Sequence, residues 1–449
     1  MSLQLLPWQT EALGIWHKSR RRGIIEAVTG SGKTYVAFGA LEQLHAEDRR
    51  LNTLIVVPTV PLMNQWLEKL AKIFPDRRIG RIGGGHTDDF SRFPFACVAV
   101  INSAVRKVGD LLGHTLKGPV KSFLIADECH HYIEAPVFKR IRGFPFHYTL
   151  GLSATIDPYD VPGLGKVVFE YGFKQANQDN LVPNFDLVNT VVELTGSEEV
   201  SYSQLSKKIG EQIQLLKEAY YNELLHVSEG DFFQRLKQLM VRDDGTEDPV
   251  IKHLFGLIFR RVKIYYMSEH KMALATRLIR ALVLDGRKKT IVFFERIGSA
   301  EDVQDNAALE AASTLQAQIR TSIWCRVFHS GMKQPDREQV LKEFRATGPS
   351  ALLACRCLDE GIDIPEVDAA ILVASTQSAR QRIQRIGRTL RRGDGSKRPM
   401  IITLYCRETQ DVNVIQNDRE TFEGVAKFHT VTEHNCMNTI ERLINGGRC

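Results

Sequence analysis

The sequence predicts an α/β protein made of two parallel-sheet domains in tandem with a helical insert between them. Short Val/Ile/Leu runs alternate with amphipathic segments through about the first 180 residues, as in buried parallel strands covered by helices. The stretch 197–282 has helical periodicity and little strand signal, and the alternation then resumes. At 449 residues, the chain is long enough for two domains with good cores.

The elements of the first domain, expected over 1–196, follow from local patterns. "PLMNQWLEKLAKI" has helical spacing, and Pro61 suits a helix start. The buried runs predict strands over 23–28, 51–58, 95–101, 123–128 and 148–155.

The rest of the chain divides by the same reasoning. The insert, 197–282, contains two helical stretches separated by the polar turn "RDDGTEDP". We expect a second domain over 283–406 and a C-terminal helical tail over 407–449. The second domain has strand patterns over 290–295, 323–329, 351–356, 369–375 and 399–405.

Bulk composition excludes several classes of protein. With 43% hydrophobic and 25% charged residues and no apolar run of 18, the sequence predicts no membrane span. The N-terminus lacks the basic and apolar regions of a secretory signal. Eight cysteines without a CxxC pair favour a reducing cytoplasm and argue against a structural zinc module. The net charge of +6 is compatible with a polyanionic partner, but solubility alone would account for it.

A phosphate-binding loop is predicted at "AVTGSGKT", residues 27–34, directly after a strand and before a helical run. Lys33 would supply charge to the β and γ phosphates, and the Thr34 hydroxyl would bind Mg²⁺. The structural alternative is a glycine-rich turn, and the first position, normally Gly, is Ala27. The backbone that would cradle the phosphates belongs to Thr29, Gly30, Ser31, Gly32 and Lys33.

The stretch "LIADECHHYIEAP", residues 124–136, places two carboxylates at a strand end. A phosphate-loop ATPase needs a carboxylate there, so Asp127 would hold the Mg²⁺ shell and Glu128 would polarise the attacking water. Zinc at Cys129, His130 and His131 is the weaker alternative, because adjacent residues of an extended chain point to opposite faces.

These segments occur in an order that resembles the superfamily 2 helicases and translocases, closest in style to the XPB/UvsW-like branch. The resemblance covers roughly residues 5–405 and implies two RecA-like domains, ATP and Mg²⁺ as cofactors, and a nucleic acid partner. It depends on seven segments in order: "TGSGKT", "VVPT", "DECH", "SAT", "FHSGM", "LDEGIDIP" and "QRIGRTLR". The Leu390 position differs from the Gly of DEAD-box proteins.

Further roles come from the resemblance, position by position. Gln9 matches the glutamine that reads adenine, and the neighbouring Trp8 is either a core residue or packs on the base. His130, Ser153 and Thr155 match residues that couple hydrolysis to domain movement. Gly361 and Asp363 match a motif that touches the ribose and the strand.

The last motif matches Gln384, Arg388 and Arg391, the two arginines as fingers from the second domain. A transition state with a charged γ-phosphate needs cations from across a cleft, and one arginine finger is worth about 10³–10⁵ in rate. The alternatives are a solvated basic helix and a contact to the phosphate backbone.

Strand contacts are expected where small residues leave backbone N–H groups accessible to phosphates. The "GGG" at 83–85 could equally be a flexible loop. The expected contacts are Thr59, Gly84, Ser103, His329 and Gly331.

The function that follows is an ATP-dependent helicase or translocase, with DNA favoured over RNA as the strand. The alternative is a motor subunit that acts with a protein partner, such as a nuclease, in a repair or phage-defence assembly. A phosphate-loop kinase is weaker still, since a kinase needs a phosphoacceptor pocket in place of the second α/β domain.

Overall fold

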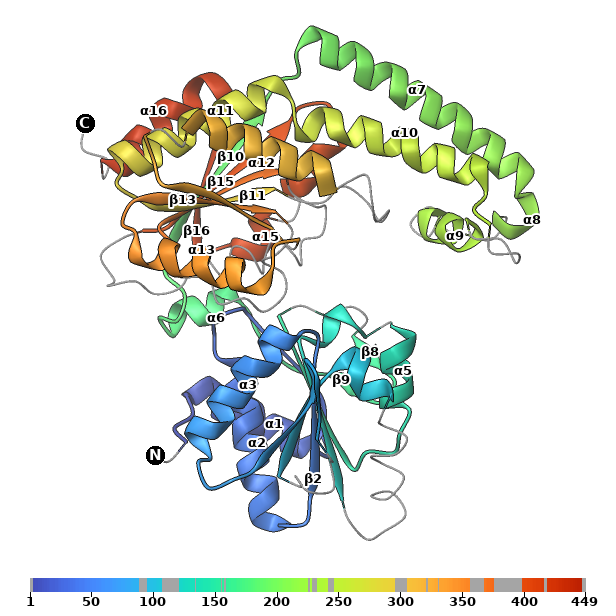
Figure 1. The fold of residues 1–449 in the computed structure, drawn as a ribbon, viewed down its shortest axis with the longest axis vertical. Helices are drawn as coiled ribbons and strands as arrows, with labels where there is room; N and C mark the ends of the chain where they lie inside the picture. Colours follow the sequence, from blue (N-terminus) through green and yellow to red (C-terminus); the bar gives the residue numbers. More distant parts are fainter. Residues whose placement is uncertain are drawn as a thin grey trace.

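The structure is a computed structural model, and Figure 1 shows two α/β lobes with a long helical arm on the second. It describes residues 3–88, 95–106, 121–133, 135–154, 156, 159–224, 227, 232–240, 246–294, 305–319, 322–329, 331–355, 367–374, 398–415 and 418–445. No helix in these ranges is both long and apolar enough to cross a membrane.

The first lobe is a nine-stranded sheet in the order β4-β3-β5-β2-β6-β7-β1-β9-β8. Its central strands pair in parallel, whereas β3/β4 and β8/β9 are antiparallel. The strands are β1 (Arg22–Ala27), β2 (Asn52–Val57), β3 (Ile79–Gly83), β4 (His86–Thr87), β5 (Ala96–Val100), β6 (Ser122–Asp127), β7 (Tyr148–Ser153), β8 (Asp160–Val161) and β9 (Gly165–Tyr171). The helices are α1 (Pro7–Lys18), α2 (Lys33–Glu47), α3 (Val60–Ile73), α5 (Pro136–Arg142) and α6 (Phe173–Gln178).

The second lobe is a seven-stranded parallel sheet in the order β12-β13-β11-β14-β15-β10-β16. Its strands are β10 (Phe185–Val192), β11 (Lys289–Phe294), β12 (Cys325–His329), β13 (Ser350–Cys355), β14 (Ala369–Ala374), β15 (Met400–Cys406) and β16 (Ala426–Thr432). Its helices are α11 (Glu269–Arg280), α12 (Asp305–Ile319), α13 (Gln334–Ala346), α15 (Asp418–Phe422) and α16 (Glu433–Ile444).

The helical arm follows β10. Its long helices α7 (Gly196–Ala219) and α10 (Pro249–Tyr266) run side by side away from the second lobe, with α8 (Tyr221–Leu224) and α9 (Phe232–Leu239) at the far end (Figure 1). The arm has its own cluster of buried side chains, which includes Ile209, Leu216 and Leu254.

The two lobes are joined through packed aromatic rings. Phe422 of α15 makes edge-on contacts with Phe173 of α6 and with Phe185 of β10, at centroid distances of 5.0 and 5.5 Å. All three rings belong to one buried cluster that contains residues of both sheets.

The expected fold class is confirmed: the structure has two parallel α/β domains with a mainly helical segment between them. The strands of β2, β6, β13 and β15 are buried almost throughout, which explains their continuous apolar sequences.

The expected domain boundaries differ from the structure in three places. β10 lies within the range expected for the first domain but pairs with β15 and β16 of the second sheet. The segment 407–449, expected as a helical tail, contributes β16 to that sheet. The end of the insert also belongs to the second domain, because Leu274 and Leu278 of α11 lie in its core.

Candidate active site

The segment 27–34, expected to bind phosphate, spans the turn between β1 and α2. Gly30 and Gly32 have φ angles of +89° and +92°, a region that glycine enters without the penalty of a Cβ atom. A Cβ added at Gly32 would also lie only 2.8 Å from Gln9 Nε2. The Ser31 hydroxyl donates to Val28 O at 2.7 Å, which fixes the turn.

Lys33, the first residue of α2, has an ammonium group that suits an anionic ligand. Its side chain is only 7% exposed, and Nζ lies 3.4 Å from Glu128 Oε1. Among the described residues, Nζ has no hydrogen-bond acceptor. Because a buried cation needs paired charge and hydrogen bonds, this position fits a phosphate group.

Asp127 is the last residue of β6 and is only 3% exposed. Its Oδ2 accepts the indole N–H of Trp66 at 2.6 Å, and its Oδ1 accepts the backbone N–H of Glu128 at 3.0 Å. Burial, followed by the neighbouring Glu128 charge, raises the pKa of Asp127 above the usual range. A cation beside this carboxylate would favour its ionised form, so the position fits a metal ion.

Glu128 adopts an uncommon backbone conformation. Its φ of +46° and ψ of +44° place a non-glycine residue in the left-handed region, where strain often marks functional sites. This conformation directs the side chain toward Lys33 and within 3.6 Å of His130 Nδ1.

The oxygen ligands present suit magnesium better than zinc. Thr34 is half-buried beside Lys33 and supplies a hydroxyl, and Asp127 supplies a carboxylate, both ligands that Mg²⁺ accepts. Cys129 is fully buried, and burial raises the pKa of its thiol, so it stays protonated. Within the described part of the chain, no group of three or more His, Cys, Asp or Glu side chains could hold a metal ion.

His130 and Ser153, expected to act as a coupling pair, are in contact. His130 Nδ1 and Ser153 Oγ are 2.9 Å apart and both side chains are buried. Ser153 ends β7 and pairs with Glu26 of β1, while Asp127 pairs with Leu152. The phosphate-loop strand, the carboxylate strand and the "SAT" strand therefore end at one edge of the sheet.

Gln9 lies against the phosphate loop. Its Nε2 donates to Gly32 O at 3.1 Å and its Oε1 accepts Leu6 N–H at 2.8 Å. The structure therefore gives Gln9 a supporting contact that sequence reasoning missed. Trp8 is buried and stacks on Tyr171 at 4.4 Å, which places it in the core.

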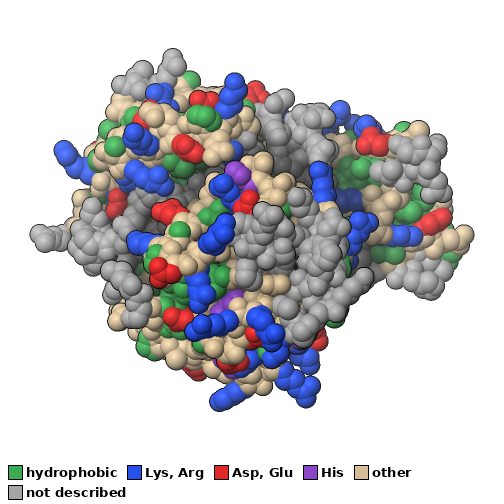
Figure 2. Space-filling view, turned by 60° about the horizontal axis from the view of Figure 1, so that its bottom comes forward, with side chains coloured by type: hydrophobic (Ala, Val, Ile, Leu, Met, Phe, Trp, Pro, Cys, Tyr) green, Lys and Arg blue, Asp and Glu red, His purple; other side chains and the backbone are tan. Residues whose placement is uncertain are grey.

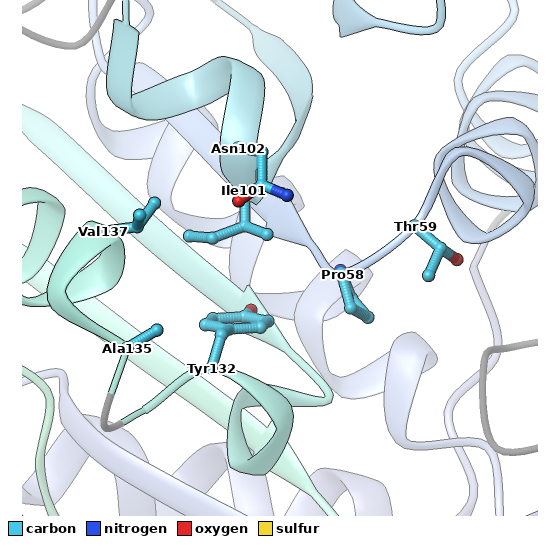
Figure 3. Close-up of a pocket in the computed structure, with 7 residues that line it drawn as sticks. All are labelled: Pro58, Thr59, Ile101, Asn102, Tyr132, Ala135 and Val137. Carbon is cyan, nitrogen blue, oxygen red and sulfur yellow. The ribbon is translucent and has the colours of Figure 1, made fainter. Parts of the chain in front are cut away.

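The expected strand contacts of the first lobe lie close together. Thr59 caps α3 by accepting Leu62 N–H at 3.5 Å. A Cβ at Gly84 would lie 3.1 Å from Val60, and one at Gly83 would lie 3.6 Å from Ser103 Oγ. Pro58 and Thr59 line a pocket of about 300 Å³ together with Ile101, Asn102 and Tyr132; these residues are labelled in Figure 3.

In the second lobe, His329 ends β12 and Gly331 follows it closely. A Cβ at Gly331 would lie 3.2 Å from His329 Nδ1. Six expected site residues lie outside the described residues: Thr155, Gly361, Asp363, Gln384, Arg388 and Arg391.

Two buried residues next to Asp127 were not foreseen from the sequence. Trp66 donates to the Asp127 carboxylate, and the Tyr132 hydroxyl lies 2.8 Å from the Asp127 carbonyl oxygen. The only available signal was the position of Trp66 in the helix that follows "VVPT", seven residues after Thr59.

Two family models match the chain. Residues 2–158 match "Type III restriction enzyme, res subunit", and residues 271–393 match "Helicase conserved C-terminal domain".

Among curated relatives, the chain is 27% identical over 424 residues to the "DNA 3'-5' translocase XPB2" of Sulfurisphaera tokodaii, covering 93% of this chain and 85% of the relative. It is 24% identical to the "Putative DNA 3'-5' helicase Rad25" of Halobacterium salinarum, over 92% of this chain. The match spans 56% of that Rad25 protein and 55% of a second one, from Haloarcula marismortui.

Solved structures share the fold. The helicase domain of Pyrococcus furiosus Hef superposes with a TM-score of 0.53 at 19% identity, covering 91% of this chain and 97% of that one. Dbp5 of S. cerevisiae, bound to RNA and ADP BeF3, gives 0.58 at 16% identity, covering 98% and 93%.

Proposed function

We propose that the chain, a member of the superfamily 2 helicases and translocases in the branch of the XPB and Rad25 proteins, is a DNA motor that couples ATP hydrolysis to movement along a strand. We further propose 3′→5′ movement, the polarity named for the archaeal relatives.

One observation carries this proposal: a buried lysine ammonium and two carboxylates meet at the edge where three strands of the first sheet end. Lys33 Nζ is 3.4 Å from Glu128, next to Asp127, and lacks a hydrogen-bond acceptor among the described residues. Phosphoryl transfer depends on this kind of positioned charge, with little covalent chemistry from the protein.

Each residue then has a role toward Mg²⁺ and ATP, which family membership implies as cofactors. ATP supplies the γ-phosphoryl group whose transfer to water releases the free energy. Lys33 neutralises phosphate charge, Thr34 and Asp127 hold the Mg²⁺ shell, and Glu128 accepts the proton of the attacking water.

The second lobe contributes through residues assigned by the family motif. Arg388 and Arg391 act as fingers on the γ-phosphate, and Gln384 belongs to the same sequence motif. Gly361 and Asp363 contact the ribose and the strand. His130, Ser153 and Thr155 transmit the nucleotide state to the movement between the lobes.

Nucleic acid is held by its phosphates, with no reading of base sequence. Thr59, Gly84 and Ser103 form the first-lobe contact, and His329 and Gly331 the second. Lys and Arg side chains are spread over the face drawn in Figure 2 with Asp and Glu among them.

A motor subunit that depends on a partner nuclease is the less favoured function, because the curated relatives that match more than nine tenths of the chain are named as a DNA translocase and a DNA helicase. We also propose a cytoplasmic location in association with nucleic acid, in keeping with the cysteine usage.

The test is the ATPase rate with single-stranded, duplex and forked DNA and with RNA, each at two salt concentrations. We expect DNA to stimulate hydrolysis, with an affinity that falls steeply as salt rises. Equal rates with and without every ligand would contradict the proposal, and stimulation by RNA alone would overturn the assignment to DNA.

A further inference from the structure

Trp66 connects the carboxylate site to α3, the helix that begins just after Thr59, one of the expected strand contacts. Its side chain is only 1% exposed, and its indole N–H donates to Asp127 Oδ2 at 2.6 Å. Because Glu128 N–H holds the other carboxylate oxygen at 3.0 Å, both oxygens of Asp127 have a donor. Two donors in different directions fix the plane of the carboxylate.

Trp66 lies on the helix that Thr59 caps. Thr59 caps α3, and Trp66 follows it by seven residues, about two turns of a continuous helix. Because both residues belong to one continuous hydrogen-bonded helix and its cap, a displacement at Thr59 would have a direct path to the indole of Trp66.

The hydroxyl of Tyr132 provides a second link between the segment at Thr59 and the segment at Asp127, through two backbone carbonyl oxygens. The Tyr132 hydroxyl lies 3.0 Å from Val56 O and 2.8 Å from Asp127 O. Val56 lies in β2, just before Pro58 and Thr59, and β2 pairs with β6. Tyr132 also lines the pocket next to Pro58 and Thr59 (Figure 3).

Trp66 also contacts the helix that starts with Lys33. The ring of Phe38 in α2 meets the indole edge-on, with a centroid distance of 5.3 Å and an interplanar angle of 77°. Trp66 therefore contacts both the phosphate-loop helix and the carboxylate strand.

We propose that Trp66 is a positioning residue that transmits strand engagement at Thr59 to the orientation of Asp127, and so to the binding of the nucleotide's Mg²⁺, with Tyr132 holding the backbone of the same link. This inference rests on the proposed function. It predicts that nucleotide and strand bind with mutual tightening, because a coupling free energy between two sites is reciprocal.

The test compares Trp66→Phe with Trp16→Phe, a matched control in the same lobe. Trp16 is also fully buried, and its indole N–H donates to Thr149 O at 2.9 Å, away from the carboxylates. Affinity for a fluorescent, non-hydrolysable ATP analogue is measured with Mg²⁺ and with EDTA, each with and without single-stranded DNA. Thermal unfolding confirms that both variants fold.

We expect Trp66→Phe to lose about tenfold of the Mg²⁺-dependent tightening, since a buried hydrogen bond to a charged group is lost. We also expect it to lose most of the tightening by DNA, while Trp16→Phe keeps both effects. A Trp66→Phe variant that matches Trp16→Phe in both would overturn the proposal.

Tyr132→Phe keeps the ring and removes only the hydroxyl, so it decides the question if Trp66→Phe does not fold. Reduced tightening by DNA is expected, and unchanged tightening would overturn the proposal. If the native protein binds no strand, the proposed function fails, while the Mg²⁺ comparison still decides whether Trp66 positions Asp127.

Discussion

Lys33 and Glu128 are the side chains on which the proposed hydrolysis depends most. Lys33→Ala removes the cation that faces the phosphates, and Glu128→Gln removes the proton acceptor but keeps the side-chain size. We expect each to lower the ATPase rate by about 10²–10⁴-fold. A steady-state phosphate-release assay measures this, with the exposed Lys166→Ala and Glu170→Gln of the same lobe as controls. Near-native turnover in either site variant would refute the assignment.

Ser153 is predicted to affect movement more than hydrolysis. Ser153→Ala removes the 2.9 Å contact with His130 but leaves the pair of Lys33 and Glu128 in place. We expect ATP hydrolysis within about tenfold of the native rate, judged against the size of one catalytic contribution, and a much larger loss of strand displacement.

A matched control is available for this prediction in Ser122, another buried serine of the sheet whose hydroxyl contacts a histidine. Ser122 Oγ lies 3.2 Å from His147 Nδ1, at the start of β6 and so at the opposite edge of the sheet. Ser122→Ala should leave the ratio of displacement to hydrolysis unchanged. Equal effects of the two variants on this ratio would count against a coupling role for Ser153.

At the scale of elements, α10 of the helical arm depends on the residue that caps its N-terminus. The Asp248 carboxylate caps α10 by accepting the N–H groups of Val250 and Ile251 at 2.9 and 3.1 Å, and also accepts the Tyr220 hydroxyl at the end of α7. We expect Asp248→Ala to destabilise the arm by about 1–2 kcal/mol. Amide hydrogen exchange in α7 and α10 would reveal it, and Asp248→Asn, which retains an acceptor, should be much milder. Equal protection in all three proteins would contradict the capping role.

Helix α2 carries a buried histidine that makes stability depend on pH. Burial lowers the pKa of His45 to about 4 from an unfolded value near 6.5. The folded state therefore binds fewer protons than the unfolded state between these values, so stability is fully present above pH 6.5 and falls as the pH decreases toward 4. The expected loss is about 3 kcal/mol in the free energy of unfolding.

Urea unfolding at a series of pH values measures this slope, and His45→Gln is the comparison because it has no imidazole to titrate. The variant should lose less stability than the native protein over the same range. Parallel curves for the two proteins would show that His45 does not supply the dependence.

Some elements could be predicted from the sequence and others could not, for physical reasons. The central strands were predictable because both faces are buried and each ends at a recognisable motif, as with β1 before "TGSGKT" and β6 before "DECH". β16 was missed because its residues alternate between half-buried and exposed, which leaves no apolar run. β10 has a clear apolar run, but its partners β15 and β16 lie more than 200 residues away, so its domain could not be assigned locally.

Some contacts of the candidate site could likewise be predicted from the sequence, and others could not. Lys33, Asp127, Glu128 and the contact of His130 with Ser153 follow from motif order and from the common edge of parallel strands. The contact of Trp66 with Asp127 depends on how α3 is rotated about its own axis against the sheet. The hydrophobic pattern of α3 predicts that Trp66 is buried, but not which residue it contacts. The supporting contact of Gln9 depends on where α1 packs, and that too is set by tertiary structure.

At the scale of the whole molecule, the proposed function is that of a motor: two lobes with packed aromatic rings between them change their relative position as ATP is hydrolysed. The most direct measurement is ATP-dependent displacement of a block from DNA, either streptavidin at one end of a single strand or a third strand on a duplex. We predict release of at least one block with ATP, with the 5′ end favoured on single strands, and no release by Glu128→Gln. DNA-stimulated hydrolysis without release of either block would contradict the claim.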